Sequence, residues 1–230
     1  GIYWQKPVLG LHEDLNGSRQ NNIVMVGTPH AKKTRLVGGT VFKDPRAARD
    51  RKYKFVWLVL GAYSPDGIHW TRYPRSLFSG IAGDTAPVAF WDDRLDRYVA
   101  YSRKNIWSRC DPEESKNYTR AVRVEGDQIL RRHVVRAESD DFENWGTFET
   151  VLAPGEEGEE RGYDFYNSGA LKYPWAEDAY FLHTSRYHYE PNSLDVQLAL
   201  SRDGIHWHRP SPEPFIPRGG DETFDARGIY

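Results

Sequence analysis

Short runs of apolar and β-branched residues alternate with polar turns along the whole chain. No segment longer than about ten residues has the period of a helix, so the pattern predicts an all-β fold. The predicted strands fall into repeated units of four, each completed by a strand after a hairpin. The runs that define the other strands are 21–26, 38–43 and 53–60, then 84–91, 97–103 and 133–139, then 164–173, 179–186 and 195–201.

The hairpins carry the clearest repeat in the chain. S-P-D-G-I-H-W at 64–70 returns as S-R-D-G-I-H-W at 201–207 and, in degraded form, as S-D-D-F-E-N-W at 139–145, while G-I-Y-W at 1–4 matches its tail. We expect the Ser and Asp side chains to bond local backbone N–H groups and the Gly to take a positive φ. These hairpins then serve turn formation and packing, which excludes Asp66, Asp140 and Asp203 from the candidate site.

Four-stranded units that recur roughly every 60 to 80 residues, without helices, are typical of a β-propeller. We predict one propeller domain over 1–230, with three complete four-stranded antiparallel blades at about 11–77, 78–150 and 151–212. Residues 1–10 and 213–230 are predicted to belong to partial blades. Because three or four blades would make a small ring, the pattern favours a chain that lacks part of its propeller.

Composition narrows the class of partner. With 33 acidic and 31 basic residues the formal net charge is −2, which does not favour a nucleic-acid partner. No apolar run reaches the length of a membrane span, and the single Cys110 excludes an intrachain disulfide. The 8 Trp, 14 Tyr and 10 Phe suit both a β core and stacking against sugar rings. A carbohydrate is therefore the expected partner, and the oligomeric state is left open.

Candidate chemistry lies at the heads of the innermost predicted strands, where Asn22, Asp84, Asp164 and Asp225 follow the repeat. Equivalent positions in successive blades converge on the propeller axis, so three carboxylates would meet in one funnel. Clustered, partly desolvated carboxylates push one another's pKa values apart, and glycoside hydrolysis needs such a pair. The alternative is that each aspartate only caps its own strand or turn.

Further candidates for substrate binding stand near the same predicted funnel. Arg103 and Arg186 close two second strands, and either could donate paired hydrogen bonds to a carboxylate or to sugar hydroxyls, or pair structurally with a neighbouring blade. The remaining candidates are Trp91, Tyr166, Asn167 and His183. No metal or cofactor is predicted, because three aspartates would hold Ca²⁺ only with further oxygen donors; a structural Ca²⁺ in the channel stays open.

The S-x-D-G-x-x-W hairpins and the D-T-A-P-V-A-F-W-D and D-F-Y-N-S-G-A strands resemble those of the five-bladed β-propeller glycoside hydrolases. The likeness is to the group around families 43 and 32, including uncharacterised bacterial members. It implies a retaining or inverting, secreted or periplasmic glycosidase. Asp84, Asp164 and Asp225 would act as base or nucleophile, transition-state stabiliser and proton donor. The proton donor of that group is commonly Glu, for which Glu222 and Glu190 are the candidates here.

Other classes of function fit the same features. A non-catalytic carbohydrate-binding propeller would bind an oligosaccharide without releasing product. In a structural or protein-binding propeller the aromatic residues would only form the core. A sugar phosphorylase would need a basic anion pocket, for which Arg103, Arg186 and Arg227 are the candidates.

Overall fold

Strands form nearly all of the regular structure, which confirms the all-β prediction. The computed structural model describes residues 3–27, 36, 38–82, 86–110, 122–155 and 162–229. Within these ranges the chain forms thirteen strands and one helical element, the three-residue 3-10 helix η2 (Arg49–Arg51).

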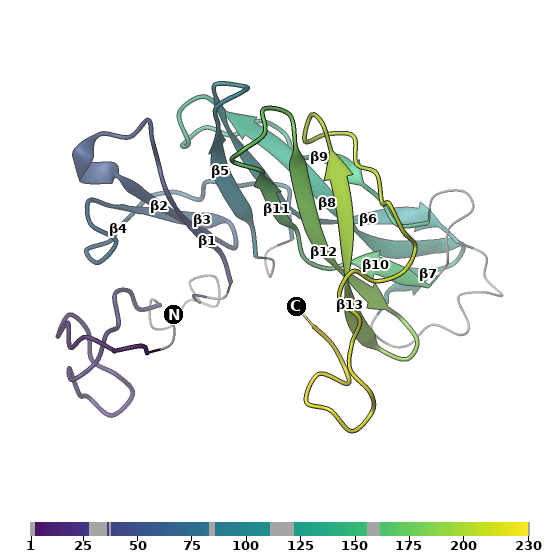
Figure 1. Ribbon diagram of the computed structural model, residues 1–230, viewed down its shortest axis with the longest axis horizontal. Coiled ribbons are helices and arrows are strands. Elements are labelled where there is room, and N and C mark those ends of the chain that lie inside the picture. The colour runs from purple at the N-terminus through teal and green to yellow at the C-terminus, as the bar shows by residue number, and fades with distance from the viewer. Residues whose placement is uncertain are drawn as a thin grey trace.

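The strands form three antiparallel sheets, which appear in blue, teal and green in Figure 1. The first sheet pairs β1 (Thr40–Lys43), β2 (Tyr53–Trp57), β3 (Leu60–Ser64) and β4 (Thr71–Arg72) in chain order. The second pairs β5 (Val88–Asp92), β6 (Arg97–Arg109) and β8 (Gln128–Ser139), with β7 (Val124–Glu125) and β9 (Glu149–Leu152) also on β8. In the third, β10 (Tyr163–Phe165), β11 (Gly169–Lys172) and β13 (Ser193–Ser201) all pair with β12 (Tyr180–His188).

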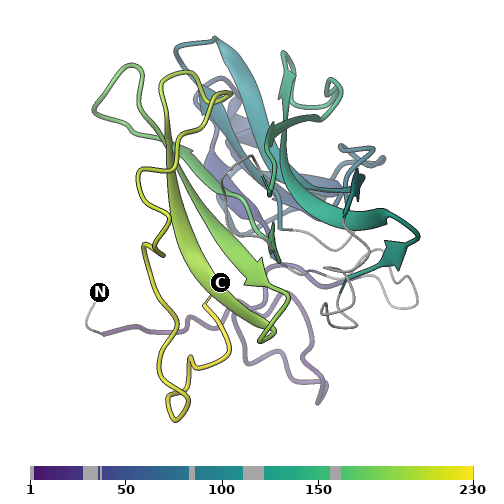
Figure 2. The same ribbon diagram turned by 90° about the vertical axis from the view of Figure 1, so that its right-hand side faces the viewer.

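Strands near the start of each sheet lie side by side. β5 contacts both β1 and β11, and these strands meet near the centre of Figure 1. Thr40 Oγ1 donates to the Pro87 carbonyl at 3.1 Å, and Lys172 Nζ lies 2.6 Å from Asp93. Figure 2 shows the third sheet beside the second, with the first sheet behind them. The described strands do not close into a barrel or ring, so the propeller and its blade number stay predictions.

Each boundary between sheets carries the same buried hydrogen bond. Tyr98, near the start of β6, donates to Asp44 at 2.8 Å, and Tyr180, which begins β12, donates to Asp92 at 2.6 Å. Both aspartates are buried and end the first strand of the preceding sheet or directly follow it. A buried carboxylate is costly without such partners, so the pair fixes how successive sheets pack.

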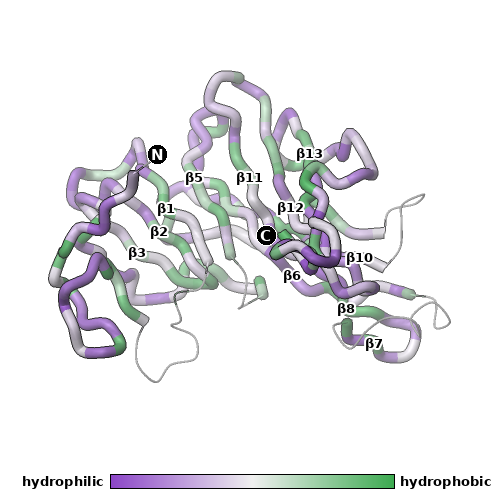
Figure 3. The backbone as a smooth tube through the Cα atoms, turned by 60° about the horizontal axis from the view of Figure 1, so that its bottom comes forward, coloured by the Kyte–Doolittle hydropathy of each residue, from purple (hydrophilic) through white to green (hydrophobic). Residues whose placement is uncertain are grey.

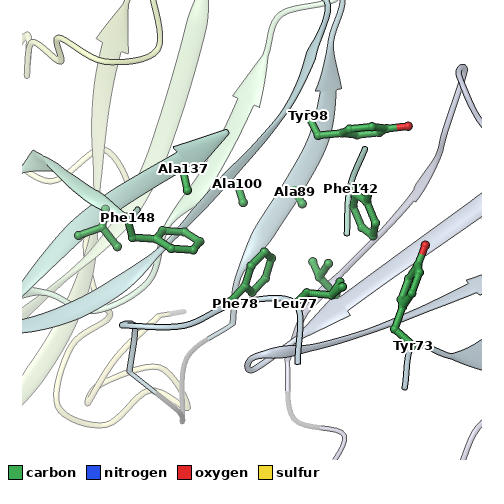
Figure 4. Packing of buried hydrophobic residues seen from close by; sticks show 11 residues of the cluster. Tyr73, Leu77, Phe78, Ala89, Tyr98, Ala100, Ala137, Phe142 and Phe148 are labelled. Atoms are coloured by element: carbon green, nitrogen blue, oxygen red, sulfur yellow. The ribbon is translucent and has the colours of Figure 1, made fainter. Parts of the chain in front are cut away.

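Apolar clusters fill both boundaries. Figure 4 shows the cluster between the first two sheets, in which Phe142 packs against Tyr98 with ring centroids 5.3 Å apart. The second cluster joins strands β6 and β8 to the third sheet and includes Tyr101, Tyr163 and Leu182. Hydrophobic stretches lie along many of the strands in Figure 3, whereas the loops are largely hydrophilic.

The three hairpins form with the bonds that their sequence predicts. In the first, Ser64 Oγ accepts the N–H groups of Asp66 and Gly67, and Gly67 has φ 80°. The hairpins at 139–145 and 201–207 repeat this arrangement. The third residue of the degraded copy is Asp141, so Asp141 rather than Asp140 is the equivalent of Asp66.

Three predicted strands are wrong. Residues 164–173 form two strands, β10 and β11, rather than one. Residues 53–60 form two strands, β2 and β3, because Leu58 takes φ 52° and turns the chain back so that Trp57 pairs with Leu60. Residues 21–26 form no strand. Their first residue, Asn21, instead bonds the carbonyls of His12 and Ser18 and ties down a local loop.

Two strands of the second unit are longer than predicted. The strand predicted at 97–103 continues to Arg109 as β6, and the one predicted at 133–139 already begins at Gln128 as β8; residues 111–121 lie outside the described part. In the segment predicted to belong to a partial blade, 213–230, Gly228 forms a single parallel bridge with Leu194 of β13. The segment after β13 thus covers the edge of the third sheet.

Candidate functional site

A pocket of 480 Å³ opens where β10 and the end of β12 meet the last described segment of the chain. Two arginines, two tyrosines and an asparagine provide most of its polar and aromatic surface. We call it the Arg132 pocket; it is lined by Arg132, Tyr166, Tyr187, Asn192, Leu194, Arg227 and Gly228.

Asp164 lies directly behind this pocket and has no exposed surface. Tyr189 donates to its Oδ1 at 2.5 Å, and Arg132 donates to its Oδ2 at 2.8 Å. Burial raises the pKa of Asp164, and the bonds from Tyr189 and Arg132 oppose that rise only in part. Both carboxylate oxygens therefore hold neighbouring side chains in place.

Arg132 joins the buried carboxylate to the pocket. It comes from β8, which contacts β10 across the boundary between the second and third sheets. Its guanidinium carbon lies 5.4 Å from the ring centroid of Tyr166 and 5.2 Å from that of Tyr187. The side chain is 20% exposed. A bond to Asp164 and two aromatic faces therefore orient Arg132 while part of it reaches solvent.

Aromatic rings and an amide form the pocket wall. The rings of Tyr166 and Tyr187 lie 6.0 Å apart, and Tyr187 Oη donates to Asn192 Oδ1 at 2.6 Å. The backbone N–H of Tyr166 bonds the Ser185 carbonyl. The guanidinium carbon of Arg103 also lies 4.8 Å from the ring centroid of Tyr166. The wall is thus fixed by the sheet and combines flat apolar faces with polar tips.

The segment after β13 closes the pocket. The carbonyl of Arg227 accepts the N–H of Leu194 at 3.0 Å, and Arg227 Nη1 lies 3.4 Å from the Pro191 carbonyl. A side chain on Gly228 would meet Leu194, since its Cβ would lie 2.8 Å from Leu194 Cβ. Close backbone approach therefore places the exposed side chain of Arg227 at the rim.

The structure brings part of the predicted set to this pocket. Tyr166 lines it, and Asp164 and Arg103 support it from behind. Asp225 stands two residues before Arg227, and its carboxylate packs against Gly219. Asp84 lies outside the described residues.

The other predicted side chains lie elsewhere. Trp91 packs at the boundary of the first two sheets under Arg46, and His183 contacts Phe215. Arg186 is buried in a paired contact with Asp195, at 3.2 and 3.1 Å.

Two further predicted residues, Asn22 and Asn167, do not line the pocket. Asn22 is exposed in the N-terminal segment, and Asn167 accepts a bond from Thr184 at its backbone carbonyl. The two candidate glutamates, Glu190 and Glu222, are exposed.

Sequence reasoning missed Arg132, Tyr187 and Asn192. Arg132 stands in the run R-R-H-V-V, where it looked like the polar start of a strand rather than a site residue. Its partner Asp164 is 32 residues away. Only the packing of β8 against β10 brings them together, and no local pattern reports that packing.

A second pocket, of 520 Å³, lies at the opposite end of the third sheet beside the last hairpin. Its lining includes Tyr180, Asp203, His206 and His208. His206 Nδ1 lies 2.7 Å from Asp203 Oδ2, and His69 repeats this contact with Asp66. The repetition in another hairpin indicates turn stabilisation rather than a site of its own.

Metal ligation and membrane spanning find no support within the described ranges. No group of three or more His, Cys, Asp or Glu side chains there is arranged to hold a metal ion. No helix in that part of the chain has the length and apolar character needed to cross a bilayer.

Comparison with known proteins relates this chain to solved structures only, since no family model and no curated protein matches it. A glycoside hydrolase and a complex of BT0996 with RGII each match at 15% identity and TM-score 0.51, covering 80% of this protein and 55% of the other. An N-acetylgalactosamine deacetylase from F. plautii, in complex with blood group B trisaccharide, matches at 16% identity and TM-score 0.40, over 83% and 72%. The chain thus spans about half the length of the first two, and the likeness is one of fold.

Proposed function

We propose that this protein binds a carbohydrate in the Arg132 pocket and hydrolyses a glycosidic bond there. The observation that carries the proposal is the pocket wall itself. Tyr166 and Tyr187 offer flat faces to a sugar ring, and Arg132, Arg227 and Asn192 offer polar groups to its oxygens. Sites of this size with a few convergent polar groups are typical of small-ligand binding.

The proposed chemistry uses acids that follow the repeat in the sequence. Asp84 and Asp225 are the candidates for the acid and base pair, one protonated to assist the leaving group and one ionised. Asp164 acts as a positioning residue, because its contact with the pocket runs through Arg132. The raised pKa of Asp164, caused mainly by burial, favours a proton on this carboxyl over a wider pH range.

We further propose that the three sheets are blades of a β-propeller of the five-bladed type, in the group around families 43 and 32. Support comes from the antiparallel pairing within all three sheets and from the tyrosine–aspartate bond repeated at both boundaries. The likeness of fold to a glycoside hydrolase, at TM-score 0.51, relates the chain to a protein of the proposed activity class.

A non-catalytic carbohydrate-binding protein is the second candidate, and one observation favours it. Asp164 has no exposed surface, and both of its oxygens already accept hydrogen bonds. A substrate atom therefore has no direct access to it. This candidate predicts saturable binding of an oligosaccharide without product. A phosphorylase, which would use Arg132 and Arg227 to bind phosphate, predicts turnover only when phosphate is added.

The test replaces the two proposed acids, Asp84 and Asp225, and the positioning residue Asp164 by their amides. Purified wild type is incubated with a panel of neutral and acidic oligosaccharides, and reducing ends are measured with Asp84→Asn, Asp164→Asn and Asp225→Asn. Loss of acid or base catalysis lowers turnover by about 10²- to 10⁴-fold, whereas the control Asp140→Asn, an exposed aspartate paired with Arg97, keeps full activity. Full activity in all three variants rejects the catalytic proposal, and binding without product supports the second candidate.

A further inference from the structure

The Arg132 pocket carries an excess of positive charge. Arg132 and Arg227 line it, and Arg103 stands behind Tyr166. Among the residues that the structure describes, no carboxylate lines the pocket, and the nearest one in contact with it is the buried Asp164. The described lining therefore presents cationic donors to a ligand without an opposing acid at the surface.

The surroundings of Arg132 hold its guanidinium at the pocket. The bond from Nη1 of Arg132 to Asp164 and the contacts with the rings of Tyr166 and Tyr187 together orient the guanidinium. A guanidinium binds a carboxylate more strongly than it binds a neutral hydroxyl group. Asn192, held by Tyr187 at 2.6 Å, adds an amide that bonds either hydroxyl or carboxylate oxygens. Tyr166 and Tyr187 provide the apolar faces that a sugar ring stacks on.

We propose that the pocket selects sugars that carry a carboxylate, such as uronic acids, with Arg132 and Arg227 as the groups that bind the anion. That the ligand is a sugar rests on the function proposed above, while that it carries a negative charge rests on the two arginines alone. Asp164 acts as a positioning residue for Arg132, and the tyrosines contact the ring.

Calorimetric titration of the full chain tests this selectivity. The probes are oligogalacturonate, the same oligosaccharide with its carboxylates methyl-esterified, neutral galactose oligosaccharides and inorganic phosphate. The expected result is binding of oligogalacturonate at least 10-fold tighter than of its methyl ester, because each charged hydrogen bond is worth a factor of about 10 to 100. Higher salt concentration weakens binding of the acid form and leaves the ester unaffected.

Matched variants locate the interaction. Arg227→Gln, at an exposed position, should lower affinity for oligogalacturonate by about 10-fold or more and lower affinity for the ester by a smaller factor, so that the preference for the acid form shrinks. Arg132→Gln should do the same, with folding checked by thermal unfolding. The control Arg202→Gln removes an exposed arginine that pairs with Asp178 just beyond the opposite end of β13, and should change nothing.

The outcomes separate the two proposals. Equal affinity for acid and ester, or no effect of Arg227→Gln, overturns acid selectivity while sugar binding stands. Binding of phosphate but of no sugar overturns the carbohydrate proposal and makes the pocket an anion site. Binding of none of the four probes overturns both.

Discussion

The hairpins at 64–70 and 201–207 and the Arg132 pocket both depend on aspartates, but these aspartates have different partners. At the hairpins, Asp66 and Asp203 accept backbone N–H groups and a histidine in the same geometry twice over. At the pocket, Asp164 accepts side-chain bonds from Tyr189, just after β12, and from Arg132 of β8. Between the described strands of the first two sheets, no buried arginine–aspartate pair of this kind crosses the boundary. Repetition marks what each sheet needs in order to fold, and the unrepeated contacts mark where a ligand is expected.

Replacing Asp164 by alanine should have the largest effect. The change leaves Arg132, which is only 20% exposed, without its carboxylate, and breaking a pair of this kind costs about 3–5 kcal/mol when it is buried. Urea unfolding should show a loss near the lower end of this range, accompanied by loss of sugar binding. A variant with unchanged stability would mean that the Asp164–Arg132 bond does not organise the pocket.

Adding a methyl group at two equivalent hairpin glycines should have a smaller and unequal effect. Gly67 and Gly204 have φ 80° and 75°, so alanine at either costs about 1–2 kcal/mol. At Gly204 the new Cβ would also lie 2.6 Å from Tyr101 Oη, whereas nothing lies within 4 Å at Gly67. Thermal unfolding should therefore show a larger loss for Gly204→Ala than for Gly67→Ala, with sugar binding intact in both. Equal losses of stability in the two variants would show that Tyr101 moves away from the added methyl group without destabilising the fold.

Acid titration of stability should give the smallest effects, with opposite signs for the two regions. Burial would raise the pKa of Asp203, but bonds from His206 and nearby N–H groups outweigh it and lower the pKa. The ionised carboxylate of Asp203 therefore stabilises the folded state above the pKa of an unfolded aspartate, near pH 4. This stabilisation is lost as the pH falls further. Burial raises the pKa of Asp164, so the protonated carboxyl stabilises the folded protein below about pH 4. This stabilisation is lost as the pH rises.

Urea unfolding between about pH 2.5 and 7 checks these signs. The destabilisation caused by Asp203→Asn should shrink as pH falls below about 4, whereas that caused by Asp164→Asn should shrink as pH rises. If the destabilisation changed with pH in the same direction for both variants, the contrast between hairpin and pocket would be contradicted.

Local chemistry explains how far the sequence predicts this fold. The hairpins follow from Ser, Asp and Gly at fixed offsets, and the strands near 97–103, 179–186 and 195–201 follow from their apolar pattern, because both depend on neighbours in the chain. Leu58 gave no turn signal, since an apolar residue with positive φ is uncommon.

The candidate site was less accessible to sequence reasoning. Asp164 and Tyr166 stand in a recognisable strand, but Arg132 reaches them only because β8 packs on β10. The spacing of the repeat predicted that Asn22 heads an innermost strand, as the aspartates do. The first strand described in that sheet instead begins at Thr40. Non-local pairing therefore decides which polar residues meet.

Hydrogen–deuterium exchange with and without oligogalacturonate tests the contrast between pocket and hairpins most directly. We expect added protection at 163–168, 186–194 and 227–229, which carry or adjoin the pocket, and none at the hairpins 64–70, 139–145 and 201–207. Protection confined to the hairpins, or none anywhere at saturating oligosaccharide, would contradict it.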